Sequence, residues 1–208
     1  MSRAVLFISM QAFLSGGLSL SGAAQPKPNR VLIRVYNKTH VSRAALSRAE
    51  QVASEIFAEA GLTVSWADGS LEDHQATSLD FSGRSGGALT CSAGRDFTEI
   101  RVGLVRGPST EVMTNTLGLA LPCAQYGSDA TIFVDRCEAV MLNSRASFPK
   151  ILGHAMAHEI GHVLLGSNAH SAAGLMKARW DTADWLRVAA AHVPIAQVDA
   201  KTMRENVG

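Results

Sequence analysis

This sequence of 208 residues has almost no excess of charge of either sign, few long apolar runs and only three cysteines. Its 19 Lys and Arg residues nearly balance 18 Asp and Glu residues, and the net charge of +1 is not gathered into a basic stripe or an acidic tail. The charge pattern therefore predicts neither nucleic acid nor a membrane surface as a partner, and we expect a monomer whose partner has a small footprint. Because 47% of the residues are hydrophobic, disorder is also excluded and one domain with a good core is expected.

The one extended apolar stretch lies near the N-terminus, at residues 4–20, behind the positively charged Arg3. It is a poor membrane span because Gln, Ser and Gly residues interrupt it. Small residues follow in the pattern of a signal-peptide cleavage site, and the absence of cysteine there argues against a lipid anchor. We therefore predict that residues 1–24 are an export signal. Residues 25–208 would then form a single domain that is secreted or otherwise extracytoplasmic and does not contact a membrane.

Export makes the three cysteines informative, because one pair could be oxidised outside the cytosol. Cys91 precedes a strand expected at 98–105, and Cys123 precedes one expected at 129–135. If these strands are parallel neighbours, both cysteines lie at the same end of the sheet. We therefore favour a disulfide between Cys91 and Cys123, with Cys137 left as a small apolar residue. The spacing alone leaves a pairing of Cys123 with Cys137 open.

The first part of the mature chain predicts a strand, a helix and a second strand. Alternating apolar residues mark a strand at 30–36, and a similar run marks a strand at 62–66. Between them Ser42 is a good N-cap, apolar residues recur at helical spacing, and Gly61 is a good helix stop. This order predicts a right-handed crossover with parallel strands.

Three more strands are expected after a loop at 67–97 that is rich in Gly, Ser and Asp. They lie at 99–105, at 117–121 and at 130–134, and the last is apolar enough to be central in a sheet. The run at 117–121 is short and is typical of an edge strand, although it could equally be part of a loop. An exposed edge can bind an extended peptide through main-chain hydrogen bonds.

The C-terminal part of the chain is helical by its pattern. Residues 150–165 are apolar nearly all round, which is typical of a buried helix. A further helix begins after its N-cap Asp181, has Leu186 among the side chains expected to pack it, and ends before Pro194. A short last helix is expected at 199–207.

The chemistry is concentrated in residues 158–176, which read HEIGHVLLGSNAHSAAGLM. Because a helix advances by about 100° per residue, His158 and His162 lie one turn apart on one face and can present two imidazoles to a single ion. Two histidines in the middle of an apolar helix cost free energy unless they are paired or bind something. Glu159 points too far round to be a natural ligand, but it is well placed to take a proton from water on that ion.

A third ligand is needed, because a catalytic zinc ion usually has three protein ligands and one open position. Gly166 is a natural helix stop, and the short polar segment after it can turn the chain back so that His170 meets the two helix histidines. The alternative is a carboxylate farther on, Asp181 or Asp184, in a site with two histidines and an acid.

Two more residues are expected around the pocket. Met176 follows Gly174 in a turn whose apolar side chain could form the floor of the metal pocket. His154 lies on the ligand side of the same helix, one turn before His158, but Ala155 rather than a glutamate follows it. We therefore interpret His154 as a residue that lines or supports the pocket.

These residues resemble the signature of the metzincin zinc metallopeptidases, H-E-x-x-H-x-x-G-x-x-H followed by a turn that bears a methionine. Two departures stand out. Leu165 occupies the position of the family's glycine, with Gly166 one place later. His170 comes two places after the position of the family's third histidine, where this chain has Asn168. We interpret this as a longer turn between the helix and the third ligand.

The resemblance implies an α/β (α+β) fold of the zincin or metzincin type: a mixed, twisted sheet of four to five strands with a backing helix and a buried active-site helix, then a Met-turn and a C-terminal helix. It implies one catalytic Zn²⁺ ion bound by His158, His162 and His170, with Glu159 as the general base and Met176 in the Met-turn. The run at 117–121 would be the counterpart of the family's edge strand beside the cleft.

The implied function is that of a secreted zinc-dependent metallopeptidase, which hydrolyses bonds in a peptide or protein substrate with metal-activated water. Two alternatives stay open: a zinc amide hydrolase that acts on cell-wall peptides, and a catalytically inactive zinc-binding interaction domain. The presence of Glu159 argues against the inactive domain, because a structural zinc site is closed by four ligands and has no use for a free carboxylate.

Overall fold

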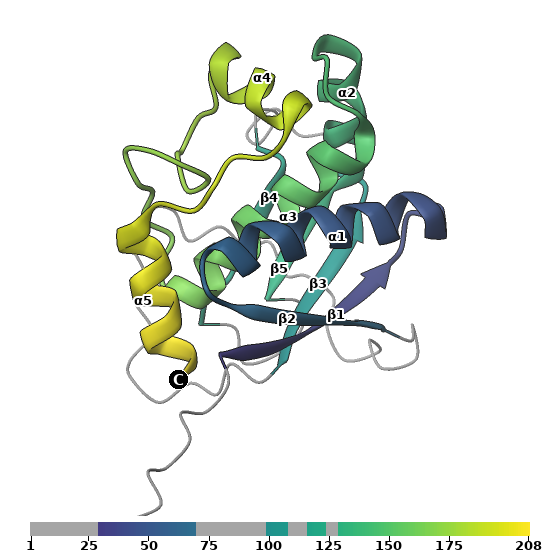
Figure 1. Cartoon of the computed structure of the whole chain (residues 1–208). Coiled ribbons are helices and arrows are strands. Elements are labelled where there is room, and N and C mark those ends of the chain that lie inside the picture. Colours follow the sequence, from purple (N-terminus) through teal and green to yellow (C-terminus); the bar gives the residue numbers. More distant parts are fainter. Residues whose placement is uncertain (1–28, 70–98, 108–115, 124–128) are drawn as a thin grey trace, which may run out of the picture.

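The computed structural model describes residues 29–69, 99–107, 116–123 and 129–208. Their strands form one five-stranded sheet in the order β2-β1-β3-β5-β4 (Figure 1). The strands are β1 (Arg30–Asn37), β2 (Thr63–Asp68), β3 (Glu99–Val105), β4 (Gly118–Ala120) and β5 (Ala130–Phe133). Every pairing is parallel except that of β4, which runs antiparallel to β5 at the edge of the sheet. The predicted mixed sheet is confirmed, and so is the short edge strand.

The β1-α1-β2 unit forms as its sequence predicts. Helix α1 (Arg43–Glu59) begins after Ser42, whose side chain accepts a hydrogen bond from the backbone N–H of Ala45 at 3.3 Å. Gly61 follows the helix with a φ of 76°, a left-handed conformation that glycine adopts without steric cost. The chain therefore turns directly into β2. The buried residues of α1 include four at the predicted helical spacing, Leu46, Ala49, Ala53 and Ile56, and also Phe57.

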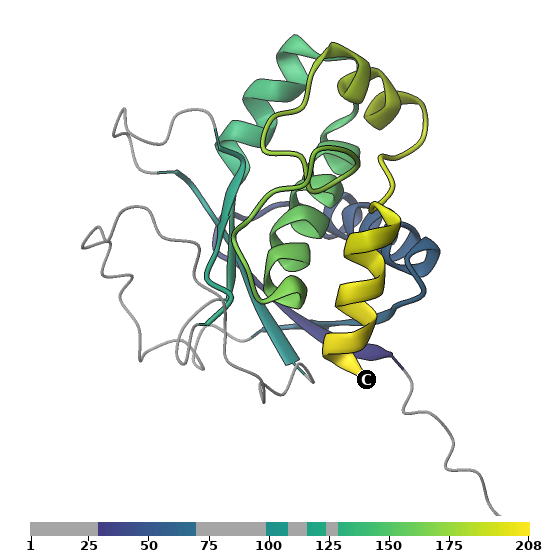
Figure 2. The ribbon, with the colours of Figure 1, turned by 90° about the vertical axis from the view of Figure 1, so that its left-hand side faces the viewer.

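Helix α3 (Phe148–Leu165) lies at the centre of the helical layer. It packs against α1, β4, β5 and α5 (Gln197–Val207), and Figure 2 shows it between the sheet and α5. Ile151, Met156 and Ile160 are completely buried, which confirms the prediction of a buried helix. The polar groups that α3 carries at its middle therefore lie wholly or partly inside the protein.

Helix α2 (Val134–Asn143) is a feature that the sequence pattern does not predict. It follows β5 without a loop, and its N-cap residue, Phe133, makes no side-chain capping bond. The apolar run at 130–134 hides the boundary, because Val134 continues the buried strand in sequence but is the first residue of the helix. An uncapped helix start leaves no signal for a pattern to find.

Helix α4 (Thr182–Ala190) and α5 lie where they are expected, with one correction. Asp181 is the N-cap of α4 and forms a capping box with Asp184. Leu186, however, is 50% exposed and does not pack the helix, whereas Val188 is completely buried. The two residues are about 200° apart around the helix axis, so only one of them can face the core.

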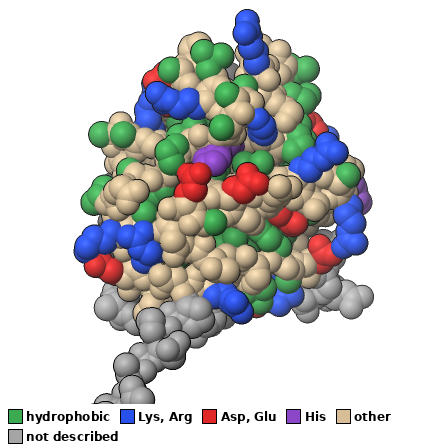
Figure 3. All heavy atoms as spheres, viewed as in Figure 1, with side chains coloured by type: hydrophobic (Ala, Val, Ile, Leu, Met, Phe, Trp, Pro, Cys, Tyr) green, Lys and Arg blue, Asp and Glu red, His purple; other side chains and the backbone are tan. Residues whose placement is uncertain are grey.

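Some predictions fall on residues outside the described ranges. They are the export signal at 1–24 and the Cys91 half of the proposed disulfide, and both stay predictions. Cys137 is a buried, free thiol, as expected for a small apolar residue. Within the described part of the chain, no helix has both the length and the apolar character to cross a membrane. The face seen in Figure 3 carries basic and acidic side chains interspersed, in line with the balanced composition.

Candidate metal centre

Helix α3 brings two of the predicted ligands together. The Nε2 atoms of His158 and His162 lie 3.1 Å apart, one helical turn from each other. The helix ends soon afterwards at its C-cap, Gly166, which has a left-handed φ of 63° and whose N–H bonds to the carbonyl oxygens of His162 and Val163. The chain therefore leaves the helix one turn beyond His162 and can fold back over both histidines.

His170 lies at the same place, on the loop that follows. Its ring centre is 5.5 Å from that of His158 and 4.7 Å from that of His162. One ligand nitrogen from each of the three histidines lies within 4.8 Å of the others. His162 is buried, His158 is half-buried and His170 is exposed. The longer turn expected between Gly166 and His170 does bring the third imidazole to the first two.

Hydrogen bonds determine which nitrogen of each helix histidine is free. His158 Nδ1 lies 2.8 Å from the carbonyl oxygen of Leu175, and His162 Nδ1 lies 3.0 Å from that of Ser167. A carbonyl oxygen can only accept, so each Nδ1 carries the proton and donates it. Each Nε2 is then a bare lone pair, and the two face each other. Tetrahedral zinc, with Zn–N bonds of about 2.0–2.1 Å, holds its ligand nitrogens about 3.3 Å apart, so the pair fits one ion.

Burial keeps the imidazoles neutral. It lowers the pKa of His158 and of His162 to about 4 each, and it also lowers the pKa of His170. A metal needs the neutral imidazole, because a proton on the lone pair blocks the bond. The three side chains are therefore in their ligand form at neutral pH, and a set of three imidazoles suits zinc.

The loop that carries His170 is fixed next to it. The Ser171 hydroxyl donates to the carboxylate of Asp199 in α5, whose two oxygens lie 2.7 and 2.8 Å away. The backbone N–H of Ser171 donates to the carbonyl oxygen of Met176 at 2.8 Å. Because Ser171 directly follows His170, these two bonds position the backbone at the third imidazole.

Met176 lies beneath the histidines in the predicted turn. The turn begins at Gly174, with a φ of 74°, and the backbone N–H of Leu175 donates to the carbonyl oxygen of Pro194 at 2.8 Å. Met176 is completely buried. A Cβ atom on Gly161 would lie only 2.7 Å from its Sδ atom, so the methionine fits under α3 because residue 161 has no side chain.

His154 and Trp180 support His158 from behind. His154 Nδ1 donates to the carbonyl oxygen of Lys150 at 2.7 Å, and its Nε2 accepts from the backbone N–H of Val193 at 3.0 Å. Both ring nitrogens are therefore occupied, and burial lowers the pKa of His154 to about 4. The Trp180 ring meets His154 and His158 edge-on. His154 thus stabilises the fold around the site and has no nitrogen left for an ion.

The two carboxylates considered as alternative ligands have other partners. Asp181 and Asp184 form the capping box of α4, and both bind the Lys177 ammonium group. Asp184 also accepts from Arg187 at 2.8 Å. Neither belongs to the group of residues around the three histidines. Their place in the structure is at the start of α4, which leaves His170 as the third candidate ligand.

Glu159 points to another side of the helix, toward the edge strand β4. It is 8% exposed and lines a cavity of about 640 Å³ together with the three histidines. Burial raises the pKa of its carboxyl group to about 8. A cation held at the histidines would favour the charged carboxylate and lower this pKa. An ion bound at the histidines would therefore shift Glu159 toward its charged carboxylate form.

Gly118 is a site residue that the sequence analysis did not single out. It is the first residue of β4, and a Cβ atom there would lie 2.6 Å from Glu159 Cγ and 2.7 Å from the carbonyl oxygen of Thr131. The Thr131 oxygen belongs to the backbone of β5, so only a glycine lets the Glu159 side chain lie against the edge strand. The available signal was a glycine inside a short strand, which often marks a close approach.

On the general-base role that the resemblance implies for Glu159, we expect Gly118→Ala to lower kcat and to leave zinc binding unchanged. The added methyl group must displace the Glu159 side chain, and a misplacement of about 1 Å can cost roughly 100-fold in rate. Steady-state kinetics and zinc content of the variant check this. Gly61→Ala is the control, because it strains the turn after α1, which does not line the cavity of Glu159, and should leave kcat unchanged. A wild-type kcat in Gly118→Ala would show that the carboxylate does not depend on this glycine.

Comparisons with known proteins place the fold. No family model matches the sequence, and no curated protein matches it. The solved structure of a zinc-dependent peptidase from Methanocorpusculum labreanum is similar with a TM-score of 0.51 and 13% sequence identity, over 82% of this chain and 99% of that one. The chain has the fold of a zinc-dependent peptidase. The structure of an archaemetzincin from Methanopyrus kandleri has a TM-score of 0.47 and 15% identity, over 88% of this chain and 98% of that one.

The zinc-peptidase fold agrees with the features that the resemblance to the metzincins implied. The mixed sheet, the backing helix α1, the buried helix α3 with its two histidines and the methionine-bearing turn all occur in the expected order. The resemblance is therefore confirmed in the fold, and the three histidines form a group that could bind a metal ion.

Proposed function

We propose that this protein is a secreted zinc-dependent metallopeptidase with one catalytic zinc ion. The observation that carries the proposal is the pair of bare Nε2 atoms of His158 and His162, which face each other across 3.1 Å beside His170. Two lone pairs this close repel each other unless a cation lies between them. Three imidazoles also leave a tetrahedral ion one open position, as in catalytic sites.

Glu159 is the group that would handle protons. Zinc bound at the three histidines would lower the pKa of a water molecule on it to about 7 and polarise the carbonyl group of the substrate. Glu159 shares the cavity with these histidines and is shielded from solvent. Its carboxylate accepts the proton of the attacking water and passes it to the leaving amine.

The edge strand β4 would hold the substrate. Leu117 and Leu121 use their backbone groups to bond with Phe133 of β5 and with Asp129 just before it, so the alternate residues Gly118 and Ala120 turn theirs toward the outer edge. This edge lines the same cavity as Glu159. An extended peptide can bind such an edge through its main chain, whatever its side chains are. That arrangement suits a peptidase better than an enzyme for one small molecule.

The proposal is tested by the zinc content and casein cleavage of wild type beside His170→Ala. We expect about one zinc ion per wild-type chain, because the three histidines form one site for a single ion. Loss of one direct ligand should weaken zinc binding by more than about 100-fold. Loss of a residue that only hydrogen-bonds to a ligand already lowers metal affinity by about 10–100-fold. His170 is exposed, so its truncation should leave the fold intact, as circular dichroism would verify.

His192→Ala is the matched control, because the half-buried His192 pairs with Glu59 and is not one of the three converging histidines. It should keep both zinc and activity. Wild type that binds no zinc would refute the metal centre. If zinc-loaded wild type leaves casein intact but cleaves cell-wall peptides, the protein is an amide hydrolase of the second kind and not a general peptidase. If it cleaves neither substrate, the result favours a zinc-binding interaction domain.

Export and the disulfide between Cys91 and Cys123 belong to the same proposal. N-terminal sequencing of secreted protein should find a chain that begins near Gln25, and non-reducing peptide mapping should find Cys137 as the one free thiol. The free thiol of Cys137 is buried, which fits this assignment. Secreted material that begins at Met1 or Ser2 would contradict the predicted cleavage.

A further inference from the structure

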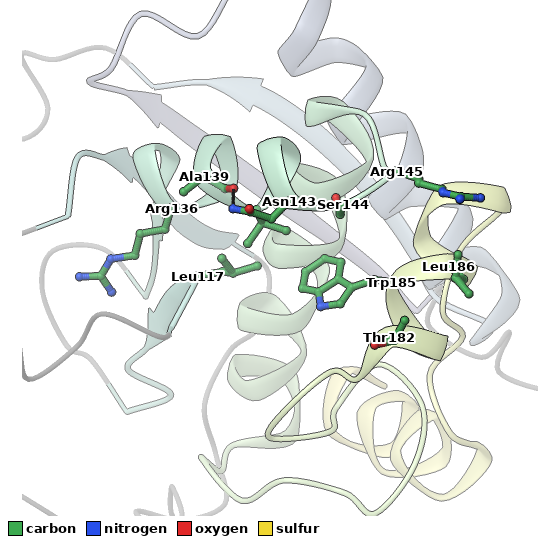
Figure 4. Close-up of a pocket in the computed structure, with 10 residues that line it drawn as sticks. Leu117, Arg136, Ala139, Asn143, Ser144, Arg145, Thr182, Trp185 and Leu186 are labelled. Carbon is green, nitrogen blue, oxygen red and sulfur yellow. Dashed lines mark hydrogen bonds between the residues drawn. The ribbon is translucent and has the colours of Figure 1, made fainter.

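A second cavity, of about 520 Å³, continues the cavity of the metal centre between helices α2 and α4. Leu117, Val140 and Trp185 line both cavities, so the two lie side by side. We call the second part the α2–α4 groove. Figure 4 shows Leu117 and Trp185 next to α2, with Thr182 and Leu186 of α4 beyond Trp185. A peptide that extends beyond the metal centre on this side reaches the α2–α4 groove next.

Aromatic rings form a continuous wall from the histidines into this groove. The ring centre of Trp180 lies 6.1 Å from that of His158, and the ring centre of Trp185 lies 5.1 Å from that of Trp180. Trp185 faces the α2–α4 groove. A peptide that leaves the metal centre along this wall therefore meets apolar surface over its first residues, and α2 closes the opposite side.

The direction of β4 determines which end of a peptide enters the groove. Leu117 precedes β4, so the α2–α4 groove lies at the start of this strand. A peptide that pairs antiparallel with β4, the more stable arrangement per residue, runs toward the start of β4. The residues on the C-terminal side of the cleaved bond, here called downstream, therefore occupy the groove.

The charge of the groove is positive. Arg136 and Arg145 line it at the two ends of α2, and none of the described residues that line it is acidic (Figure 4). Arg136 is held in place, because its Nη1 donates to the carbonyl oxygen of Thr116 at 2.9 Å and its guanidinium group lies 4.3 Å from the centre of the Phe133 ring. Arg145 is exposed, and its side chain makes no hydrogen bond or ion pair with another described residue. A guanidinium group in this position favours a carboxylate partner.

We propose that the α2–α4 groove binds the downstream segment of the substrate and that Arg145 selects a carboxylate there. The inference rests on the proposed peptidase function and names its substrate class. These substrates are peptides with an acidic side chain, or a free C-terminal carboxylate, downstream of the cleaved bond. Leu117, Val140 and Trp185 accommodate the apolar parts of the same segment.

The test is the cleavage of two synthetic peptide libraries that differ only in a C-terminal amide or a free C-terminal acid. The products are sequenced by mass spectrometry for wild type, Arg145→Gln and Arg48→Gln. We expect wild type to enrich Asp and Glu over Asn and Gln downstream by about twofold to fivefold, the worth of an exposed charged pair. Preference for the free-acid library instead identifies the C-terminal carboxylate as the group that is bound.

Arg145→Gln should remove this preference. Arg48, which is exposed on α1 and does not line the groove, is the matched control, and Arg48→Gln should retain the preference. Cleavage without any preference for a carboxylate, or a preference that persists in Arg145→Gln, would overturn the inference and leave the peptidase intact. Zinc-loaded protein that cleaves neither library nor casein would overturn the proposed function itself.

Discussion

Glu159→Gln is expected to bind zinc as wild type does and to hydrolyse casein about a thousandfold more slowly. The glutamine amide cannot accept a proton at neutral pH, and general-base groups contribute typically about 10²–10⁴-fold to the rate. The substitution keeps the shape of the side chain, so it should still fit against Gly118 in the buried space that Glu159 occupies. Zinc content, melting temperature and kcat measured on one preparation separate these effects.

Glu138→Gln is the control for this experiment. Glu138 lies on α2, 3.9 Å from Arg106 at the surface, and its charge should not matter for hydrolysis. If Glu159→Gln kept more than about a tenth of the wild-type kcat, another group would have to be the base. If it lost the metal, Glu159 would be a ligand and the three histidines would not be the complete donor set.

Removal of zinc is expected to stop hydrolysis and to lower the melting temperature by about 10 °C. An ion present at a thousand times its Kd stabilises the native state by about 4 kcal/mol. For a chain of this size each kcal/mol corresponds to roughly 2–4 °C. The physical reason is the close approach of the His158 and His162 lone pairs, which is favourable only around a cation. Thermal unfolding with and without a chelator, followed by re-addition of zinc, measures both effects.

His170→Ala should show a much smaller thermal shift on addition of zinc, because only two imidazoles remain. Calcium and magnesium should not restore activity to the zinc-free protein, since both prefer oxygen ligands to imidazole. Equal melting temperatures with and without zinc, together with undiminished hydrolysis in the presence of the chelator, would remove the metal from both fold and mechanism.

Local patterns predicted the elements that carry the site. Ser42 and Gly61 delimit α1 as expected, and Gly166 ends α3 with the left-handed φ that its sequence position suggested. The spacing of His158 and His162 was sufficient to place both on one face, because helix geometry is the same in every protein. These features depend on residues within a few positions of one another, which is the range over which a pattern is informative.

Features that depend on contacts between distant segments could not be predicted in the same way. The contact of Gly118 with Glu159 joins residues 41 positions apart across a strand and a helix. The bond between Ser171 and Asp199 likewise depends on how α5 docks. Helix α2 was missed for a different reason, because it continues a buried strand without a cap. The groove that α2 forms with α4 was therefore also invisible in the sequence.

The bond between Ser171 and Asp199 ties the third candidate ligand to the docking of α5. An isolated α3 would offer an ion only two imidazoles. Such a site binds weakly and does not discriminate between transition metals. The third imidazole is held in place by a helix that must first dock against α3. On the proposed function, a half-folded chain would thus be harmless to the cell that makes it, since it could not retain the ion that hydrolysis requires.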